Sequence, residues 1–188
     1  MRPSVKALQQ DSLHRPRVDY LKENVLCKSL SGVDVPILTI TSRLNSDPQE
    51  CHLVKMEEFE DQDSKVSLPM YKRKKYVIVA GRVHPGESNA SWMMQGFIKY
   101  LLGNSLQAKQ LRKRHIFKII PMINVDGVII GNYRTSMSGN DLNRRYHEPN
   151  PRLHPEVLAI KGLVNDIVHG KSGCHVQDQY HDPYCETK

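Results

Sequence analysis

A histidine and a glutamate three residues apart, His84 and Glu87, are the side chains in this sequence best suited to chemistry. An imidazole nitrogen and a carboxylate oxygen are both ligands that zinc accepts in proteins. The pair lies in a Pro-Gly turn that follows the apolar, β-branched run from Tyr76 to Ala80. Such a run is typical of a buried strand, and open α/β sheets place their sites in loops at strand ends. An isolated His-x-x-Glu is more often an ordinary surface turn, so the rest of the chain must decide between the two interpretations.

A second group of polar side chains lies in a loop at residues 131–152 that is rich in Gly, Ser, Asn, Arg and Pro. It holds Arg134 and the adjacent pair Asn143 and Arg144. A guanidinium binds a carboxylate by two parallel hydrogen bonds, and a neighbouring amide adds donors. A second arginine can stabilise the oxyanion that forms when a carbonyl is attacked, and zinc can supply the attacking water. These are the groups needed to remove the last residue of a peptide, although each arginine taken alone is typical of a solvated surface.

The elements expected to position these residues form a β-α-β unit. After the strand at 76–80, Ser88 or Asn89 can cap a helix that ends near Leu102. The next strand is expected at 116–120. This order implies a parallel pair of strands in an α/β sheet.

Further elements flank this unit. We expect a hairpin from strands at 24–30 and 35–41, with Pro36 indicating an edge position. A charged connection without regular structure is expected at 43–75, a turn at 124–127, and a last helix that begins at Pro155.

The stripe along the helix after Ser88 is predicted to face the core. Its members recur at helical spacing: Trp92, Met93, Phe97, Tyr100 and Leu101. The basic run from Arg112 to Arg114 is predicted to be solvated surface.

The composition indicates one globular domain. The chain has 188 residues, 39% of them hydrophobic, with a net charge of +7, which suits acidic partners. No apolar run of about 18 residues is present, so membrane insertion is not expected. The four cysteines form no Cys-x-x-Cys pair, which is typical of a cytosolic chain with reduced thiols.

Four separated segments, taken in order, resemble the cytosolic carboxypeptidases, which are zinc metallocarboxypeptidases that trim glutamates from tubulin and other proteins. The resemblance extends from about Val18 to Val168. The matching segments are His84-Pro-Gly-Glu87, Pro121-Met-Ile-Asn-Val-Asp-Gly127, Gly131-Asn-Tyr-Arg134 and Asp141-Leu-Asn-Arg-Arg145.

The resemblance implies a role for each candidate residue. His84 and Glu87 would bind Zn²⁺, Arg134 would stabilise the oxyanion, and Asn143 with Arg144 would hold the terminal carboxylate of the substrate. The implied fold class is α/β, a zinc-carboxypeptidase-like mixed sheet with helices on both faces, of which only the N-terminal half is expected here. The implied partners are polyglutamylated tails such as those of tubulin. The implied location is the cytoplasm, with the cytoskeleton, the centriole or the basal body of the cilium as further options.

The sequence departs from this family after the last predicted helix. The family places its third zinc ligand in an Asp-x-His-Gly-His-Ser segment, and this chain has His175 and His181 in an unrelated context. Its catalytic glutamate, the general base, has no counterpart here. We therefore expect an N-terminal remnant or disordered segment at 1–18, a partial catalytic domain at 19–168 and a divergent tail at 169–188. Such a half sheet should leave an open edge strand, bind zinc weakly and lack efficient peptidase activity.

Three alternatives remain open. The chain can be a binding module that recognises acidic C-terminal tails without cutting them. It can be an acylase of similar fold, since these enzymes also use a His-x-x-Glu pair. Nucleic-acid binding is suggested only by the net charge and the basic run at 112–114, without a recognised motif.

Overall fold

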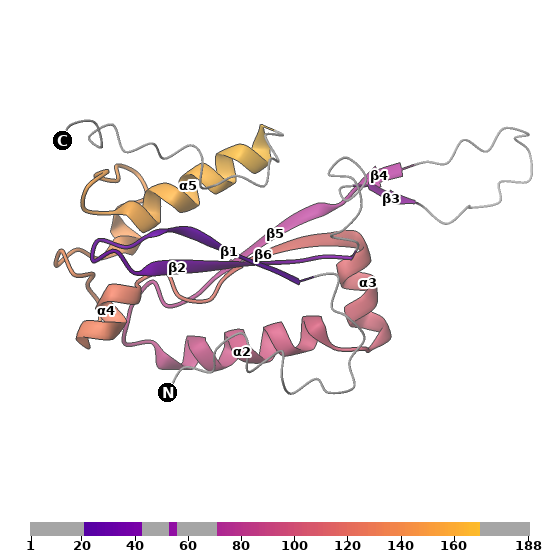
Figure 1. Ribbon diagram of the computed structural model, residues 1–188, viewed down its shortest axis with the longest axis horizontal. Coiled ribbons are helices and arrows are strands. Elements are labelled where there is room, and N and C mark those ends of the chain that lie inside the picture. The colour runs from indigo at the N-terminus through magenta and orange to yellow at the C-terminus, as the bar shows by residue number, and fades with distance from the viewer. Residues whose placement is uncertain (1–20, 43–52, 56–70, 170–188) are drawn as a thin grey trace, which may run out of the picture.

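The protein is built on a twisted mixed sheet, seen in the computed structural model, which describes residues 21–42, 53–55 and 71–169 (Figure 1). The strands are β1 (Leu21–Lys28), β2 (Asp34–Ile40), β5 (Lys75–Ala80) and β6 (His115–Ile120), in the order β1-β2-β6-β5. β5 and β6 are parallel, and the other two pairs are antiparallel. A separate antiparallel pair joins β3 (Leu53–Lys55) to β4 (Tyr71–Arg73).

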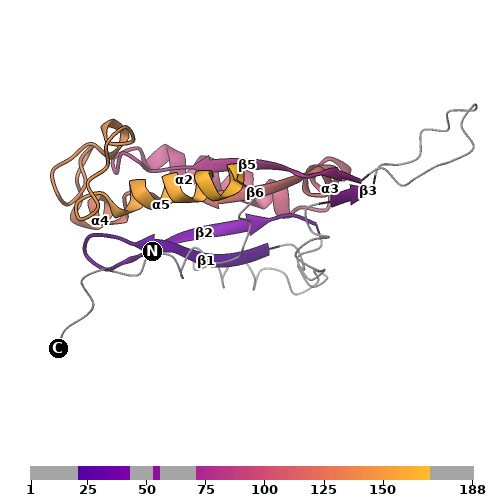
Figure 2. The ribbon, with the colours of Figure 1, turned by 90° about the horizontal axis from the view of Figure 1, so that it is seen from above.

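Helices cover both faces of the sheet, as Figures 1 and 2 show. One face carries α2 (Ser88–Leu102) and α3 (Leu106–Arg114), and the other carries α5 (Pro155–Val168). The short helices α4 (Val125–Ile130) and η1 (Leu142–Arg144) follow the C-terminal end of β6. Side chains of β6 alternate between the two cores, because Ile120 packs on the α5 side while Phe117 and Ile119 pack on the α2 side.

The predicted β-α-β unit, the hairpin and the last helix are confirmed. The edge position predicted for β2 from Pro36 is wrong, because β2 lies between β1 and β6. Pro36 lies opposite Val25, next to a shift in the β1–β2 register, and the β2–β6 ladder begins only at Leu38. Proline has no backbone N–H to donate to a neighbouring strand. Pro36 does not need one, because it lies beside the irregularity in the β1–β2 pairing and before the β2–β6 pairing begins.

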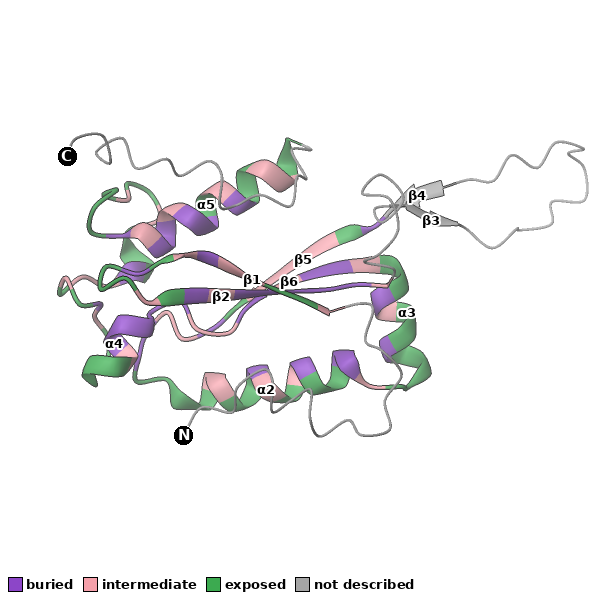
Figure 3. Cartoon of the chain, in the orientation of Figure 1, coloured by how far each residue is buried: buried purple, intermediate pink, exposed green. Residues whose placement is uncertain are grey.

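β5 is a half-buried edge strand instead of the buried strand predicted from its composition. It pairs with β6, and it has no second neighbour among the described strands. None of its six residues is fully buried (Figure 3). In the described residues the sheet has two edge strands, β1 and β5, and β5 is the one that leads into the His84 turn.

Four local predictions are also corrected. The connection at 43–75 contains β3 and β4, and the turn expected at 124–127 opens α4. Arg112, predicted as solvated, is buried and donates to the carbonyls of Leu101 and Gly103. α2 has Glu87 at its N-cap, so neither Ser88 nor Asn89 caps it.

The stripe predicted as core on α2 is mostly outside the core. Trp92, Met93 and Tyr100 are exposed, and Phe97 is half-buried. Leu101 is buried as predicted, together with Met94, Ile98 and Leu102. The helix thus carries large apolar side chains on its outward side as well as on its inward side.

The expected segment at 1–18 lies outside the described residues, and of the expected tail at 169–188 only His169, the C-cap of α5, is described. Within the described ranges, no helix is both long and apolar enough to cross a membrane.

Candidate active site

The turn that carries His84 is held by the chain that follows the neighbouring strand. Because β5 and β6 are parallel, both lead into loops at the same edge of the sheet. The Asn124 amide donates to the Arg82 carbonyl at 3.1 Å, and the Asn124 side chain donates to the Val83 carbonyl at 3.3 Å. The Ile123 amide donates to the Gly81 carbonyl at 2.9 Å. The backbone before His84 is therefore fixed on one side by residues 123 and 124.

Arg82 fixes the same turn from inside. It has a φ of 55°, the one positive φ of a non-glycine residue among those described. Its guanidinium donates to the Pro85 carbonyl and, at 2.8 Å, to the Ser91 hydroxyl in α2. A strained backbone position of this kind persists only where the surrounding contacts impose it. Arg82 thereby ties the His84 turn to the first turns of α2.

Two glycines let the loop at 131–136 lie directly on this turn. The Gly86 amide donates to the Tyr133 carbonyl at 2.7 Å, and a Cβ at Gly86 would lie 2.5 Å from the Tyr133 ring. A Cβ at Gly127 would lie 2.4 Å from the Pro85 ring and 2.8 Å from the Thr135 carbonyl. This close approach brings Arg134, next in the chain to Tyr133, to the His84 turn.

Asp141 joins the two predicted groups of site residues. His84 Nδ1 lies 2.9 Å from Glu87 Oε1, and His84 Nε2 lies 3.1 Å from Asp141 Oδ1. Arg134 donates to Asp141 Oδ2 through Nε at 2.9 Å, and its terminal nitrogen lies 2.8 Å from the same oxygen. The structure thus brings His84, Glu87 and Arg134 together around one carboxylate.

The surroundings of Asp141 keep its carboxylate ionised. Its partial burial raises its pKa, but the Asn143 amide, the His84 ring and the Arg134 guanidinium outweigh burial and hold the pKa below its ordinary value. Sequence reasoning did not assign Asp141 a role. The available signal was local, because Asp141 is the N-cap of η1 and accepts from the Asn143 amide at 2.9 Å.

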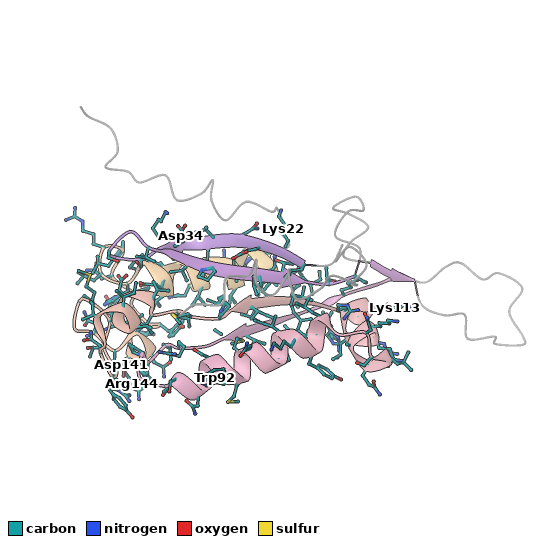
Figure 4. The ribbon with its side chains drawn as sticks, turned by 60° about the horizontal axis from the view of Figure 1, so that its bottom comes forward. Lys22, Asp34, Trp92, Lys113, Asp141 and Arg144 are labelled. Atoms are coloured by element: carbon teal, nitrogen blue, oxygen red, sulfur yellow. The ribbon has the colours of Figure 1, made fainter. Side chains whose placement is uncertain are left out.

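The predicted carboxylate clamp lies beside this network and remains available. The Asn143 and Arg144 side chains are exposed. Within the described residues, the Arg144 guanidinium has no hydrogen-bond partner. Figure 4 shows Arg144 next to Asp141 at one end of the molecule. Arg134 is only half-exposed and is bound to Asp141, so it is oriented, whereas Arg144 is not.

Comparison with known proteins identifies the family to which this site belongs. The family model described as zinc carboxypeptidase matches residues 13–186. The chain belongs to the zinc carboxypeptidase family. It is 42% identical over 171 residues to cytosolic carboxypeptidase 1 of Mus musculus, covering 91% of this chain and 13% of that protein. It is 46% identical over 152 residues to cytosolic carboxypeptidase 2 of Danio rerio, covering 81% of this chain and 18% of that protein.

Solved structures agree with this zinc carboxypeptidase assignment. A metallo-carboxypeptidase from Burkholderia cenocepacia superposes with a TM-score of 0.62 at 27% identity, over 80% of this chain and 34% of that one. A metallo-carboxypeptidase from Pseudomonas aeruginosa gives a TM-score of 0.61 at 25% identity, over 90% of this chain and 37% of that one. The resemblance seen in the sequence motifs is confirmed. The chain spans less than a fifth of the length of the two cytosolic carboxypeptidases.

The donors at the His84 turn fit part of a zinc site. A neutral imidazole can donate from only one of its two nitrogens, yet both His84 nitrogens face carboxylates. Two ligands on one tetrahedral zinc lie about 3.3 Å apart, close to the 2.9 Å between His84 Nδ1 and Glu87 Oε1. With zinc on Nδ1 of His84, Asp141 would be the carboxylate that orients the ring through its second nitrogen.

A complete zinc site needs a further ligand. The described residues contain no group of three or more His, Cys, Asp or Glu side chains placed to hold a metal. The two histidines considered from the sequence, His175 and His181, lie outside the described residues.

Proposed function

We propose that this chain provides the zinc-binding and substrate-binding part of a carboxypeptidase that removes C-terminal glutamates from polyglutamylated tails such as those of tubulin. The observation that carries the proposal is the shared carboxylate of Asp141, which contacts the proposed zinc ligand His84 and the proposed oxyanion residue Arg134 at the same time. Cytosolic carboxypeptidases among the relatives and a net charge of +7 support an acidic substrate in the cytoplasm.

Each residue has a distinct part in the proposed reaction. Asn143 and Arg144 bind the terminal carboxylate of the substrate, because an exposed guanidinium beside an amide matches its two oxygens. This places the last peptide bond near Arg134, which stabilises the negative charge that develops on the carbonyl oxygen. His84 and Glu87 hold zinc, which when bound polarises the carbonyl and activates water.

The second candidate function is binding of acidic C-terminal tails without hydrolysis. It is favoured by the metal-ligand set, because two donors converge at the turn and the described residues supply no third. Both functions use the same clamp and differ only in the chemical step.

The test compares a peptide ending in several glutamates with the same peptide amidated at its C-terminus. Release of free glutamate in the presence of zinc supports the carboxypeptidase, and binding without release supports the second candidate. In either case Arg144→Ala should weaken binding about 10-fold to 100-fold, the usual cost of losing a charged hydrogen bond. Arg152→Ala, in the same loop, is the matched control. Equal binding of the free and amidated peptides contradicts both functions.

A further inference from the structure

The outward side of α2 is an exposed apolar surface. Trp92 and Met93 are each 73% exposed, and Tyr100 is 47% exposed. The inward side is filled by Met94, Ile98, Leu101 and Leu102. A surface helix is normally polar on the side away from its core, and a helix that is apolar all round is normally covered on both sides. Aromatic and methionine side chains are enriched at protein interfaces.

The exposed side chains form a continuous line with a gap in the middle. Trp92, Gly96 and Tyr100 are spaced four residues apart, so they lie on one side of the helix. A Cβ at Gly96 would have no heavy atom within 4 Å. The two aromatic rings therefore flank an open position that can receive an apolar side chain from a partner. Leu106, the first residue of α3, is also a large apolar side chain with 67% exposure.

This surface is also basic without exception. Residues 88–125 contain no Asp or Glu. The exposed cations are Lys99 on α2 and Lys109, Lys113 and Arg114 on α3. Of these α3 cations, Lys109 and Arg114 are included in the surface. We call this set the α2–α3 surface, made of Trp92, Met93, Gly96, Lys99, Tyr100, Leu106, Lys109 and Arg114. Its charge is complementary to an acidic partner.

The α2–α3 surface begins at the candidate active site and runs away from it. α2 follows Glu87 directly, and its 15 residues extend for about 22 Å. In Figure 4, Trp92 lies at the same end of the molecule as Asp141 and Arg144, and Lys113 of α3 lies at the other end. A peptide whose C-terminus occupies the site can therefore continue along α2 toward the cations of α3.

We propose that the α2–α3 surface binds an acidic polypeptide segment that carries apolar side chains, upstream of the residues held at the site. The link to the site rests on the proposed function, whereas the binding itself rests on the surface alone. A membrane-binding helix carries cations along its whole polar side, whereas α2 carries the single cation Lys99 and the other exposed cations of this surface lie on α3. The open position at Gly96 is bordered by Met93 as well as by the two aromatic rings. An aliphatic side chain suits it, so a polypeptide is favoured over a nucleic acid.

The chain contains its own reporter for this test, because Trp92 is its single tryptophan. Titration with an acidic peptide containing leucines should shift Trp92 fluorescence to shorter wavelength as the ring leaves water. Added salt should weaken the binding, because the charged contacts are exposed. Parallel titrations use vesicles rich in phosphatidylserine and a single-stranded oligonucleotide. Saturable binding of either one in place of the peptide overturns the proposal.

A variant that lowers peptide affinity without destabilising the fold gives the clearest test of the surface. Gly96→Gln fills the open position and also favours the helix, so the thermal midpoint should stay the same or rise. Its affinity for the peptide should fall by about tenfold, the usual effect of blocking a central contact. Lys109→Glu with Arg114→Glu should remove most of the salt dependence. Lys161→Glu on α5, on the opposite face, reverses a single charge and is the control for a general effect of net charge.

The outcome separates this proposal from the proposed function. Amidation of the peptide C-terminus tests only the Asn143–Arg144 clamp, and Gly96→Gln tests only the α2–α3 surface. If amidation has no effect and Gly96→Gln still weakens binding, the clamp is wrong and the surface stands. If Gly96→Gln binds the peptide as tightly as the unmodified chain, or if no fluorescence shift occurs, the surface proposal is wrong.

Discussion

The site edge of the sheet and the outer side of α2 are built in opposite ways. At the site edge, polar groups are paired and backbone segments touch, as between Gly86 and Tyr133. On the α2–α3 surface, apolar rings are exposed and Gly96 has open space around it. Each region contains a glycine. A Cβ at Gly86 would collide with Tyr133, whereas a Cβ at Gly96 would meet no other atom.

This difference separates a region that holds one geometry from a region that can accept a partner. Paired charges and close contacts fix His84 and Arg134 in place before any ligand arrives, which is what preorganised chemistry requires. Exposed aromatic side chains gain stability only when something covers them. The two regions should therefore respond in opposite directions to the same kind of substitution.

The largest expected effect is at Gly127, where the site edge is most crowded. Gly127→Ala places a Cβ 2.4 Å from the Pro85 ring and 2.8 Å from the Thr135 carbonyl. The backbone cannot yield without moving the His84 turn, so we expect a loss of about 3 kcal/mol in the free energy of unfolding. Urea denaturation measures this loss. An unchanged midpoint would show that the edge is not crowded as described.

The next effect, nearly as large, is that of a buried carboxyl group on the free energy of unfolding. Glu156 lies in the first turn of α5 and is 2% exposed. Burial, helped by the negative charge of Asp126, raises its pKa from 4.5 to about 7. Between these two pH values the unfolded chain is ionised at Glu156 and the folded chain is not, so the free energy of unfolding falls as pH rises through this window.

Glu156→Gln should remove this dependence. Relative to the unmodified chain, the variant should gain up to about 3 kcal/mol above pH 7 and nothing below pH 4. Thermal melts across that range measure the difference. A gain of the same size at every pH would mean that the effect is one of packing and not of ionisation.

A smaller effect is expected from the orienting carboxylate. Asp141→Asn keeps the size of the side chain but removes the charge that orients His84 and Arg134, so zinc affinity should fall about 10-fold to 100-fold. Competition against a chelating dye measures it. Asp34→Asn, which loses only an exposed ion pair with Lys28, is the control and should change nothing.

The smallest effect has the opposite sign and completes the comparison. Gly96→Ala adds a Cβ that meets no atom within 4 Å. Because alanine favours a helix more than glycine does, the free energy of unfolding should rise by about 0.5–1 kcal/mol. The same urea denaturation measures this change. A destabilised variant would mean that the outer side of α2 is in contact with another part of the chain.

The sequence predicted those parts of the fold that depend on local pattern. The extent of α2 was predicted from turn and capping residues at its two ends, although the cap itself is Glu87, and the parallel β5–β6 pair was predicted from element order. The side of α2 that faces the core could not be inferred in this way, because apolar residues occur on both sides of the helix. Pro36 was misplaced for a related reason, since its tolerance in an inner strand depends on where the β6 ladder begins.

The same limit applies to the site. Residue type and motif made His84, Glu87, Arg134, Asn143 and Arg144 candidates, but not Asp141. Its role depends on a contact with His84, which lies 57 residues away in the chain. Only the tertiary arrangement reveals that one carboxylate serves two of the predicted residues.

The central claim is that His84 is a zinc ligand at a site prepared by Asp141. Its most direct test is a calorimetric zinc titration of the purified chain beside His84→Ala. We predict binding of a single zinc ion, weaker than at a closed structural site because the described donors are few, and its loss in His84→Ala. A His115→Ala control, whose ring contacts the Leu111 carbonyl far from the site, should bind as the unmodified chain does. Zinc binding that survives in His84→Ala, or none in the unmodified chain, would contradict the account.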